Sequence, residues 1–159
     1  MQDIPLPLDR SKNAARQGEF WIDAVDDVLI VAVTDPTGRI VQVNDRFCAI
    51  SGYSRQELLG QNHRILNSGT HPKNFFEEMY RTIRAGRTWR GEICNRAKDG
   101  SLYWVATTII PELGQDGRVL HYVACRFDIT EQKMAQQRLI ESTPPVKAAL
   151  GGIARSAEA

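Results

Sequence analysis

The sequence predicts an α+β domain in which a five-stranded antiparallel sheet carries helices on one face. Three observations predict it. Two β-rich segments flank a proline-glycine turn at residues 35–38, short helical segments follow over residues 44–86, and three alternating segments are separated by Asp99-Gly100 and Asp116-Gly117. The apolar sides of the sheet and the helices then cover one another. A ligand is expected in the cleft between them.

The first elements are a helix and a hairpin. Residues 1–17 have no periodicity and are typical of a flexible lead-in. Residues 18–27 predict a short helix that begins the domain, and residues 28–34 and 39–44 predict strands on either side of the 35–38 turn. The apolar residues expected on one face of the helix are Phe20, Trp21, Ala24, Val25 and Val28.

The middle of the chain predicts three helices. Residues 44–60 form two short ones, because Asn44 suits a helix cap and Ser54 followed by Glu57 predicts a capping box. A longer helix is expected between Pro72 and Gly86. Its single apolar stripe, which predicts one buried side, consists of Phe75, Phe76, Met79, Tyr80 and Ile83.

The C-terminal half predicts three consecutive antiparallel strands within residues 89–130. The domain therefore spans residues 18–130. Residues 129–142 predict a C-terminal signalling helix, and residues 143–159 predict a linker or a truncated connection to another domain. The helix has a weak heptad seam with two glutamines, formed by Ile129, Gln132, Gln136 and Leu139.

Composition narrows the class of protein. The 159 residues are 42% hydrophobic and 25% charged with a net charge of +1, which suits one globular domain and gives no bias toward nucleic acid. No apolar run approaches the roughly 20 residues that cross a bilayer, and no signal-peptide pattern is present. We expect a cytoplasmic protein that binds neither nucleic acid nor membrane.

Neither the cysteines nor the carboxylates form a recognisable catalytic or metal site. The three cysteines are widely separated and lack a CxxC pair, so they are expected to be reduced packing residues. No nucleophile elbow, zinc-protease, P-loop or dinucleotide-binding motif occurs. The sequence predicts no enzyme activity.

Several segments, in the right order, resemble the PAS family of sensory domains. They are the N-x-x-F segment starting at Asn44, the G-Y-S-x-x-E-L-x-G segment at 52–60, the K-D-G turn at 98–100 and the D-I-T segment at 128–130. The resemblance covers residues 18–141. It implies the PAS fold and a non-catalytic module that passes a sensed state to a partner.

The segment GQNHRILNSG is most similar to the flavin-binding branch of that family. Light-oxygen-voltage (LOV) domains carry a cysteine there that forms a photo-adduct with flavin, and His63 in its place excludes that photochemistry at this site. The resemblance implies flavin contacts for Asn62, Arg64 and Asn67, and a contact with the ring edge for Asn95.

Two departures from the LOV pattern imply a different recognition of the ring. Val105 stands where LOV domains have an asparagine, and Arg126 stands where they have a glutamine. The segment that begins near Trp89 resembles FAD-binding redox sensors of nitrogen fixation, methane oxidation and aerotaxis, in which a tryptophan lies near the flavin. FAD is therefore expected rather than FMN, and Thr34 joins the expected cofactor-binding residues. Haem is disfavoured, because the C-terminal half of the long helix lacks a histidine.

Structural roles compete with these assignments. The polar residues at 62–67 also suit a loop, Trp89 suits a core and Asn95 suits a strand end. His63 has three readings: a loop contact, a flavin neighbour or a haem ligand. Strand alternation does not decide where Arg126 points. In the cleft it could hold a phosphate or report flavin reduction by re-pairing with Glu92 or Asp128, and outward it would be a solvated edge.

The expected function is a sensor of redox state or oxygen that binds FAD non-covalently. Reduction converts a hydrogen-bond acceptor of the ring into a donor, so an amide or Arg126 must reorient, and the change passes through residues 129–142. A homodimer is expected, with a kinase, cyclase or receptor domain as output. Three rivals stay open: a cofactor-free interaction module, a haem or small-ligand sensor, and a blue-light sensor that forms no cysteinyl adduct.

Overall fold

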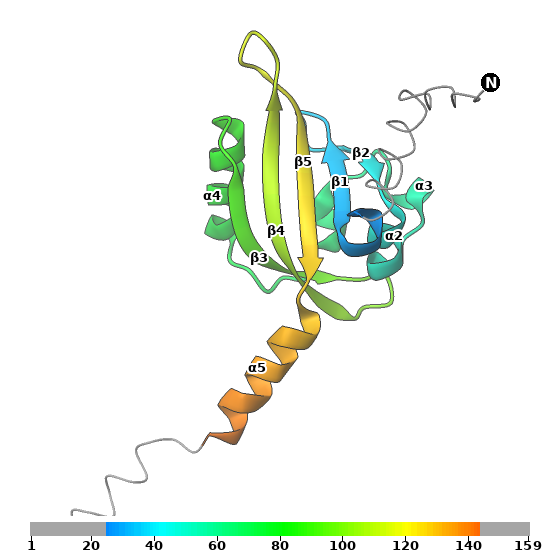
Figure 1. Ribbon diagram of the computed structural model, residues 1–159, viewed down its shortest axis with the longest axis vertical. Helices are drawn as coiled ribbons and strands as arrows, with labels where there is room; N and C mark the ends of the chain where they lie inside the picture. Colours follow the sequence, from blue (N-terminus) through cyan, green and yellow to red (C-terminus); the bar gives the residue numbers. More distant parts are fainter. Residues whose placement is uncertain (1–24, 144–159) are drawn as a thin grey trace, which may run out of the picture. The chain divides into compact units, whose positions relative to one another are not determined.

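The computed structural model describes residues 25–143 (Figure 1). Five strands form one antiparallel sheet in the order β2-β1-β5-β4-β3. Their bounds are β1 Ile30–Thr34, β2 Ile40–Val43, β3 Trp89–Arg96, β4 Leu102–Leu113 and β5 Val119–Asp128. Between β2 and β3 the chain forms α2 Asp45–Ser51, α3 Arg55–Leu58, the 3-10 helix η1 His63–Leu66 and α4 Lys73–Arg84. The α+β architecture predicted from the sequence is confirmed.

One face of the sheet forms the core with the helices. Alternate residues of β4 are buried from Tyr103 to Ile109, whereas Ile110 is 45% exposed. Phe47 of α2 and Met79 of α4 are buried in the same apolar cluster as the inward side chains of the sheet. The predicted stripe of α4 lies on this side, so the helix covers the sheet as expected.

In two hairpin turns an aspartate side chain accepts hydrogen bonds from the residue two positions later. Asp35 accepts hydrogen bonds from the backbone N–H and hydroxyl of Thr37, at 2.9 and 2.6 Å. Asp99 does the same for Ser101, at 2.9 and 2.6 Å. These hydrogen bonds hold the pKa of both carboxyl groups below its usual value, and the bond from the Thr37 or Ser101 hydroxyl has the largest effect. The carboxylates thus satisfy backbone donors that the tight turns leave unpaired.

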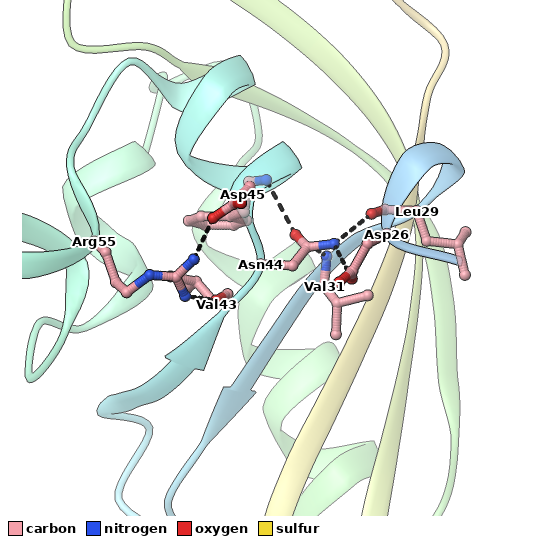
Figure 2. A network of polar contacts seen from close by, with 8 residues as sticks. Asp26, Leu29, Val31, Val43, Asn44, Asp45 and Arg55 are labelled. Carbon is pink, nitrogen blue, oxygen red and sulfur yellow. Dashed lines mark hydrogen bonds and ion pairs between the residues drawn. The ribbon is translucent and has the colours of Figure 1, made fainter. Parts of the chain in front are cut away.

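Asn44 joins three segments of the chain. Its side-chain oxygen caps α2 by accepting from the backbone N–H of Phe47 at 3.1 Å, and it also accepts from Val31 N–H at 3.0 Å. Its amide nitrogen donates to the carbonyl of Leu29 at 2.7 Å and to the carboxylate of Asp26 at 3.0 Å (Figure 2). One amide side chain therefore fixes the start of α2 against β1 and the segment before it.

Arg55 holds the same corner from α3. Its guanidinium donates to the carbonyl of Val43 and pairs with the carboxylate of Asp45 in the first turn of α2 (Figure 2). The capping box predicted at Ser54 and Glu57 is also formed. The two short helices are therefore tied to the end of β2 through polar contacts.

Replacing Asn44 with alanine is expected to lower the free energy of unfolding by about 2 kcal/mol, because a helix cap is lost and Val31 N–H is left without a partner. Urea unfolding followed by circular dichroism measures the change. Asn74, exposed on α4, gives the matched control Asn74→Ala. Equal midpoints for the two variants would contradict the role assigned to Asn44.

The predicted N-terminal helix lies mostly outside the described residues, as do its residues Phe20, Trp21 and Ala24, the 1–17 lead-in and the tail from residue 144. Residues 25–28 are helical. Val25 and Val28 are 43% and 53% exposed. Leu29 N–H donates to the carbonyl of Val25 at 2.7 Å, so helical bonding continues to this point and β1 starts at Ile30 rather than Val28.

The C-terminal helix α5, Thr130–Ser142, forms a unit of its own with residues 129–159. None of its residues is buried, and Met134, Leu139 and Ile140 are 58%, 69% and 62% exposed. The helix predicted over 129–142 is confirmed. Within residues 25–143, no helix combines the length and apolarity needed to traverse a bilayer.

Candidate functional site

A cavity of about 470 Å³ is lined by all strands except β2, by η1 and α4, and by the turn at residues 36–38. This volume lies in the usual range for small-molecule sites. Most of the stripe of α4 supplies an apolar wall. The sheet and η1 supply both polar and apolar side chains, among them Asn95 and Arg126 and also Ile93 and Ile109. The expected cleft between sheet and helices is therefore present.

The structure brings six of the eight predicted site residues to this cavity. They are Thr34, His63, Arg64, Asn67, Asn95 and Arg126. Asn67 and Asn95 lie side by side through an isolated antiparallel bridge, and Thr34 is 5% exposed at the end of β1. Residues separated by more than 90 positions in the chain therefore share one site.

Asn62 and Trp89 do not line the cavity. Asn62 caps η1, its side-chain oxygen accepting from Arg64 N–H at 3.0 Å. Trp89 is 5% exposed and its indole N–H donates to Glu78 of α4 at 2.8 Å. The indole lies over Gly91, where an added Cβ would come within 2.4 Å of the ring. Both residues hold elements that frame the site.

Arg126 points into the cavity from β5. It is 5% exposed, and its Nη1 is buried without a hydrogen-bond partner. Its guanidinium lies 5.5 Å from the ring centre of Phe47. Burial lowers its pKa to about 10, which leaves the group charged at neutral pH. Of the two orientations that the sequence allowed for the Arg126 side chain, the structure has the inward one.

His63 lies next to this guanidinium on η1. Its Nε2 is buried without a hydrogen-bond partner, and its ring stands edge-on to Phe47 with 6.0 Å between ring centres. Burial, together with the charge of Arg126, lowers its pKa to about 3. The imidazole is therefore neutral at physiological pH.

Two further polar atoms near Arg126 have no hydrogen-bond partner. They are the hydroxyl oxygens of Tyr103 and Thr107, which are 6% and 3% exposed on β4. Thr107 is the backbone partner of Arg126 across the sheet. Burial raises the pKa of Tyr103 to about 12, so its hydroxyl stays protonated. Neither residue lines the cavity, so in the described part of the chain the unpaired buried polar atoms that a ligand there can meet are Nε2 of His63 and Nη1 of Arg126. Such atoms are few in proteins and require an explanation.

Exposed charged side chains surround the outer part of the cavity. Arg64, Lys73 and Arg84 line it and are exposed, and Glu77 pairs with Lys73 at 3.5 Å. Three cations against one carboxylate favour an anionic group beside them. The cavity therefore has a buried inner part at Arg126 and an exposed cationic outer part, along which Lys73 and Arg84 stand at opposite ends of α4.

A loop between η1 and α4 closes the side of the site along β3. Ser68 Oγ donates to the carbonyl of Cys94 at 2.6 Å, and Cys94 N–H donates to His71 Nε2 at 2.8 Å. The His71 ring stacks on Phe75 with 4.3 Å between centres. Burial lowers the pKa of His71, which suits the acceptor role of its Nε2. Residues 67–71 are thus fixed against the outer strand.

Several lining residues were not among the predicted site residues. The apolar stripe of α4 was expected to be buried, but its contact with a cavity was not expected. Tyr122 and Ala124 line the cavity because they share the inward face of β5 with Arg126, four and two positions away respectively. His71 also lines it. In the described part of the chain, no group of three histidine, cysteine, aspartate or glutamate side chains is arranged as a metal site.

A family model described as PAS domain matches residues 26–131. The chain belongs to the PAS family. The five-stranded antiparallel sheet with helices on one face is accordingly the PAS fold, as the sequence resemblance implied. The match covers all the residues that line the cavity of this PAS domain.

The names of curated relatives of this PAS domain describe proteins of regulation and sensing. A nitrogen fixation regulatory protein of Klebsiella pneumoniae is 37% identical over 150 residues, which are 94% of this chain and 30% of that protein. The aerotaxis receptor of Escherichia coli K12 is 34% identical over 110 residues, 69% of this chain and 22% of that receptor. The chain spans less than a third of the length of these relatives.

Solved structures show the same fold. A PAS domain from Colwellia psychrerythraea has a TM-score of 0.63 at 25% identity, covering 71% of this chain and 97% of that one. An RNA-binding light-oxygen-voltage receptor has a TM-score of 0.68 at 25% identity, covering 89% of this chain and 40% of that one. This PAS domain is therefore similar to sensory domains in both sequence and structure.

Proposed function

We propose that this PAS domain binds FAD non-covalently in its cavity and senses redox state or oxygen. The observation that carries the proposal is the pair of unpaired buried polar atoms, Nε2 of His63 and Nη1 of Arg126, on residues that line a cavity of about 470 Å³. An isoalloxazine edge offers alternating hydrogen-bond donors and acceptors, which are the partners that these atoms lack. The names of the relatives, a nitrogen fixation regulatory protein and an aerotaxis receptor, support the same signal.

The inner and outer parts of the cavity suit the two parts of the cofactor. Asn95 and Arg126 would hold the polar edge of the ring, with His63 beside them, and the stripe of α4 would cover an apolar face. Arg64 and Lys73 in the outer part would hold the diphosphate, because guanidinium and ammonium groups bind phosphate oxygens. When bound, the flavin supplies reversible two-electron chemistry coupled to proton uptake. The protein residues orient the ring and limit its contact with water.

We further propose that α5 carries the output. Its exposed Met134, Leu139 and Ile140 give it an apolar surface that is suited to a second copy of the chain or to an output domain. A homodimer is expected for the isolated chain, and a kinase, cyclase or receptor segment is expected as the natural partner. Multi-angle light scattering gives the mass directly. A monomer at tens of micromolar would contradict the homodimer.

An absorption spectrum of the purified protein tests the cofactor. The expected result is an oxidised flavin spectrum that dithionite bleaches and air restores, with FAD released on denaturation and identified by chromatography. Arg64→Gln is expected to weaken FAD uptake by about tenfold or more and to leave riboflavin uptake unchanged, because only FAD carries the phosphates. Arg90→Gln, an exposed change on β3 away from the cavity, is the matched control.

A colourless protein that takes up neither FAD nor FMN would overturn the proposal and favour a cofactor-free interaction module. Release of FMN in place of FAD would correct the cofactor and leave the site intact. A Soret band would indicate haem. A spectrum that changes under blue light, with a signalling response, would favour light as the signal.

A further inference from the structure

We propose that Arg126 selects the charge of the bound ligand, so that the cavity prefers a negatively charged ring edge over a neutral one. Arg126 is a buried cation whose Nη1 has no hydrogen-bond partner among residues 25–143. The inference deepens the proposed function and rests on it.

The groups around the guanidinium of Arg126 are the Phe47 ring at 5.5 Å, the neutral His63 and the protonated Tyr103. Asp128, two positions further along β5, is the carboxylate whose charge acts on Tyr103. A cation held away from water costs several kcal/mol unless an anion or strong acceptors face it. Since Nη1 has no hydrogen-bond partner among residues 25–143, a bound ligand is a group that can face it.

The chemistry of this corner favours acceptors in the ligand. Nη1 of Arg126, a residue that lines the cavity, is a donor only. His63 Nε2 is uncharged, so it adds no second cation. An edge that carries a negative charge on oxygen or nitrogen meets the donors that this corner presents.

For a flavin, the anionic edge arises on reduction. Two electrons and one proton from a donor give a reduced ring with a single negative charge, whereas two electrons and two protons give a neutral one. An opposite charge a few ångströms away lowers the pKa of an acid by about 1 to 3 units. Arg126 therefore favours uptake of one proton over two.

A purely structural role for Arg126 is the competing reading. In that reading the guanidinium only packs on Phe47, and the protonation of a bound ring does not depend on it. The test thus needs a variant that removes the charge but keeps a long side chain, and a second that keeps the charge. Arg126→Met and Arg126→Lys meet these needs, and Arg90→Met, on β3 at the edge of the same sheet, is the matched exposed control.

The experiment is a potentiometric titration of the FAD-loaded proteins between pH 6 and pH 9, which counts the protons taken up per two electrons. Wild type, Arg126→Lys and Arg90→Met are expected to take up one proton throughout. Arg126→Met is expected to take up two at the acidic end, because the acid dissociation constant of the reduced ring falls by at least about tenfold. Absorption spectra of the reduced proteins report the same change.

The outcomes distinguish failure of the charge-selecting role of Arg126 from failure of flavin binding. A wild-type protein that takes up FAD, with identical proton counts in all four proteins, overturns the charge-selecting role and leaves the flavin sensor standing. A wild-type protein that takes up no flavin overturns the proposed function and, with it, this inference. A proton count that changes in Arg126→Met and is kept in Arg126→Lys establishes that the charge, and not the packing, is responsible.

Discussion

Replacing Arg126 with methionine is expected to raise the free energy of unfolding of the ligand-free protein by about 1 to 4 kcal/mol, the range found when buried ionic groups are exchanged for apolar ones of similar volume. Arg126 is 5% exposed, and its Nη1 has no hydrogen-bond partner. Methionine fills a similar volume and needs neither a hydrogen-bond partner nor a compensating charge. The attraction to Phe47 that is lost is smaller, about 0.5 to 2 kcal/mol. Urea unfolding of flavin-stripped protein measures the difference.

The same substitution is expected to act in the opposite direction once a ligand is present. Ligand binding stabilises the folded state in proportion to affinity. The variant should therefore gain less thermal stability from saturating FAD than wild type gains. Arg90→Met should behave as wild type in both states. A ligand-free Arg126→Met protein that is less stable than wild type would contradict an uncompensated charge and would indicate an unseen partner for the guanidinium.

The ligand-free protein is expected to lose about 3 kcal/mol of stability between pH 6.5 and pH 4.5 through His63. Its pKa is lowered from 6.5 to about 3 in the folded state, so the unfolded chain binds more protons over this range. Stability is then fully present above pH 6.5 and falls by about 1.4 kcal/mol per pH unit toward the folded pKa. Urea midpoints at half-unit pH steps measure the slope.

His63→Gln is the variant that isolates this contribution, because glutamine does not titrate. In this variant the free energy of unfolding should depend much less on pH between pH 6.5 and pH 4.5. His71, whose pKa burial also lowers, adds a loss of the same sign, so His71→Gln should reduce this dependence further. His121, exposed beside Glu112 on the sheet, is the control position. Equal slopes in wild type and His63→Gln would contradict a buried neutral His63.

Local signals in the sequence were sufficient for most of the fold. The aspartate-glycine turns gave the strand boundaries to within two residues, since the side chain that sets each turn is in the turn itself. The caps at Asn44 and Ser54 were likewise readable, because capping is an interaction between near neighbours. The further contacts of Asn44 with Asp26 and Val31 were not, because they depend on strand pairing.

The site was harder to predict because it depends on which face each strand presents. Arg126 could not be placed until its register with Thr107 and Ile30 was known. Asn62 was grouped with cofactor-binding residues by resemblance, yet its side chain caps η1. Trp89 was a candidate for stacking, and its ring lies instead between Gly91 and Glu78. In each case the role depends on which groups the folded backbone brings next to the side chain, and the sequence pattern alone does not show this.

The loop at residues 67–71 has a consequence for association between chains. β3 is an outer strand of the sheet, and such strands offer free backbone groups on which other chains can add as new strands or begin to aggregate. Here Ser68 and His71 occupy the backbone groups of Cys94, and Asn67 bridges to Asn95. Strand addition is thereby blocked along half of β3, and an incoming chain is left only the part near Trp89. The same loop that lines the ligand site therefore also limits strand addition at the β3 edge of the sheet.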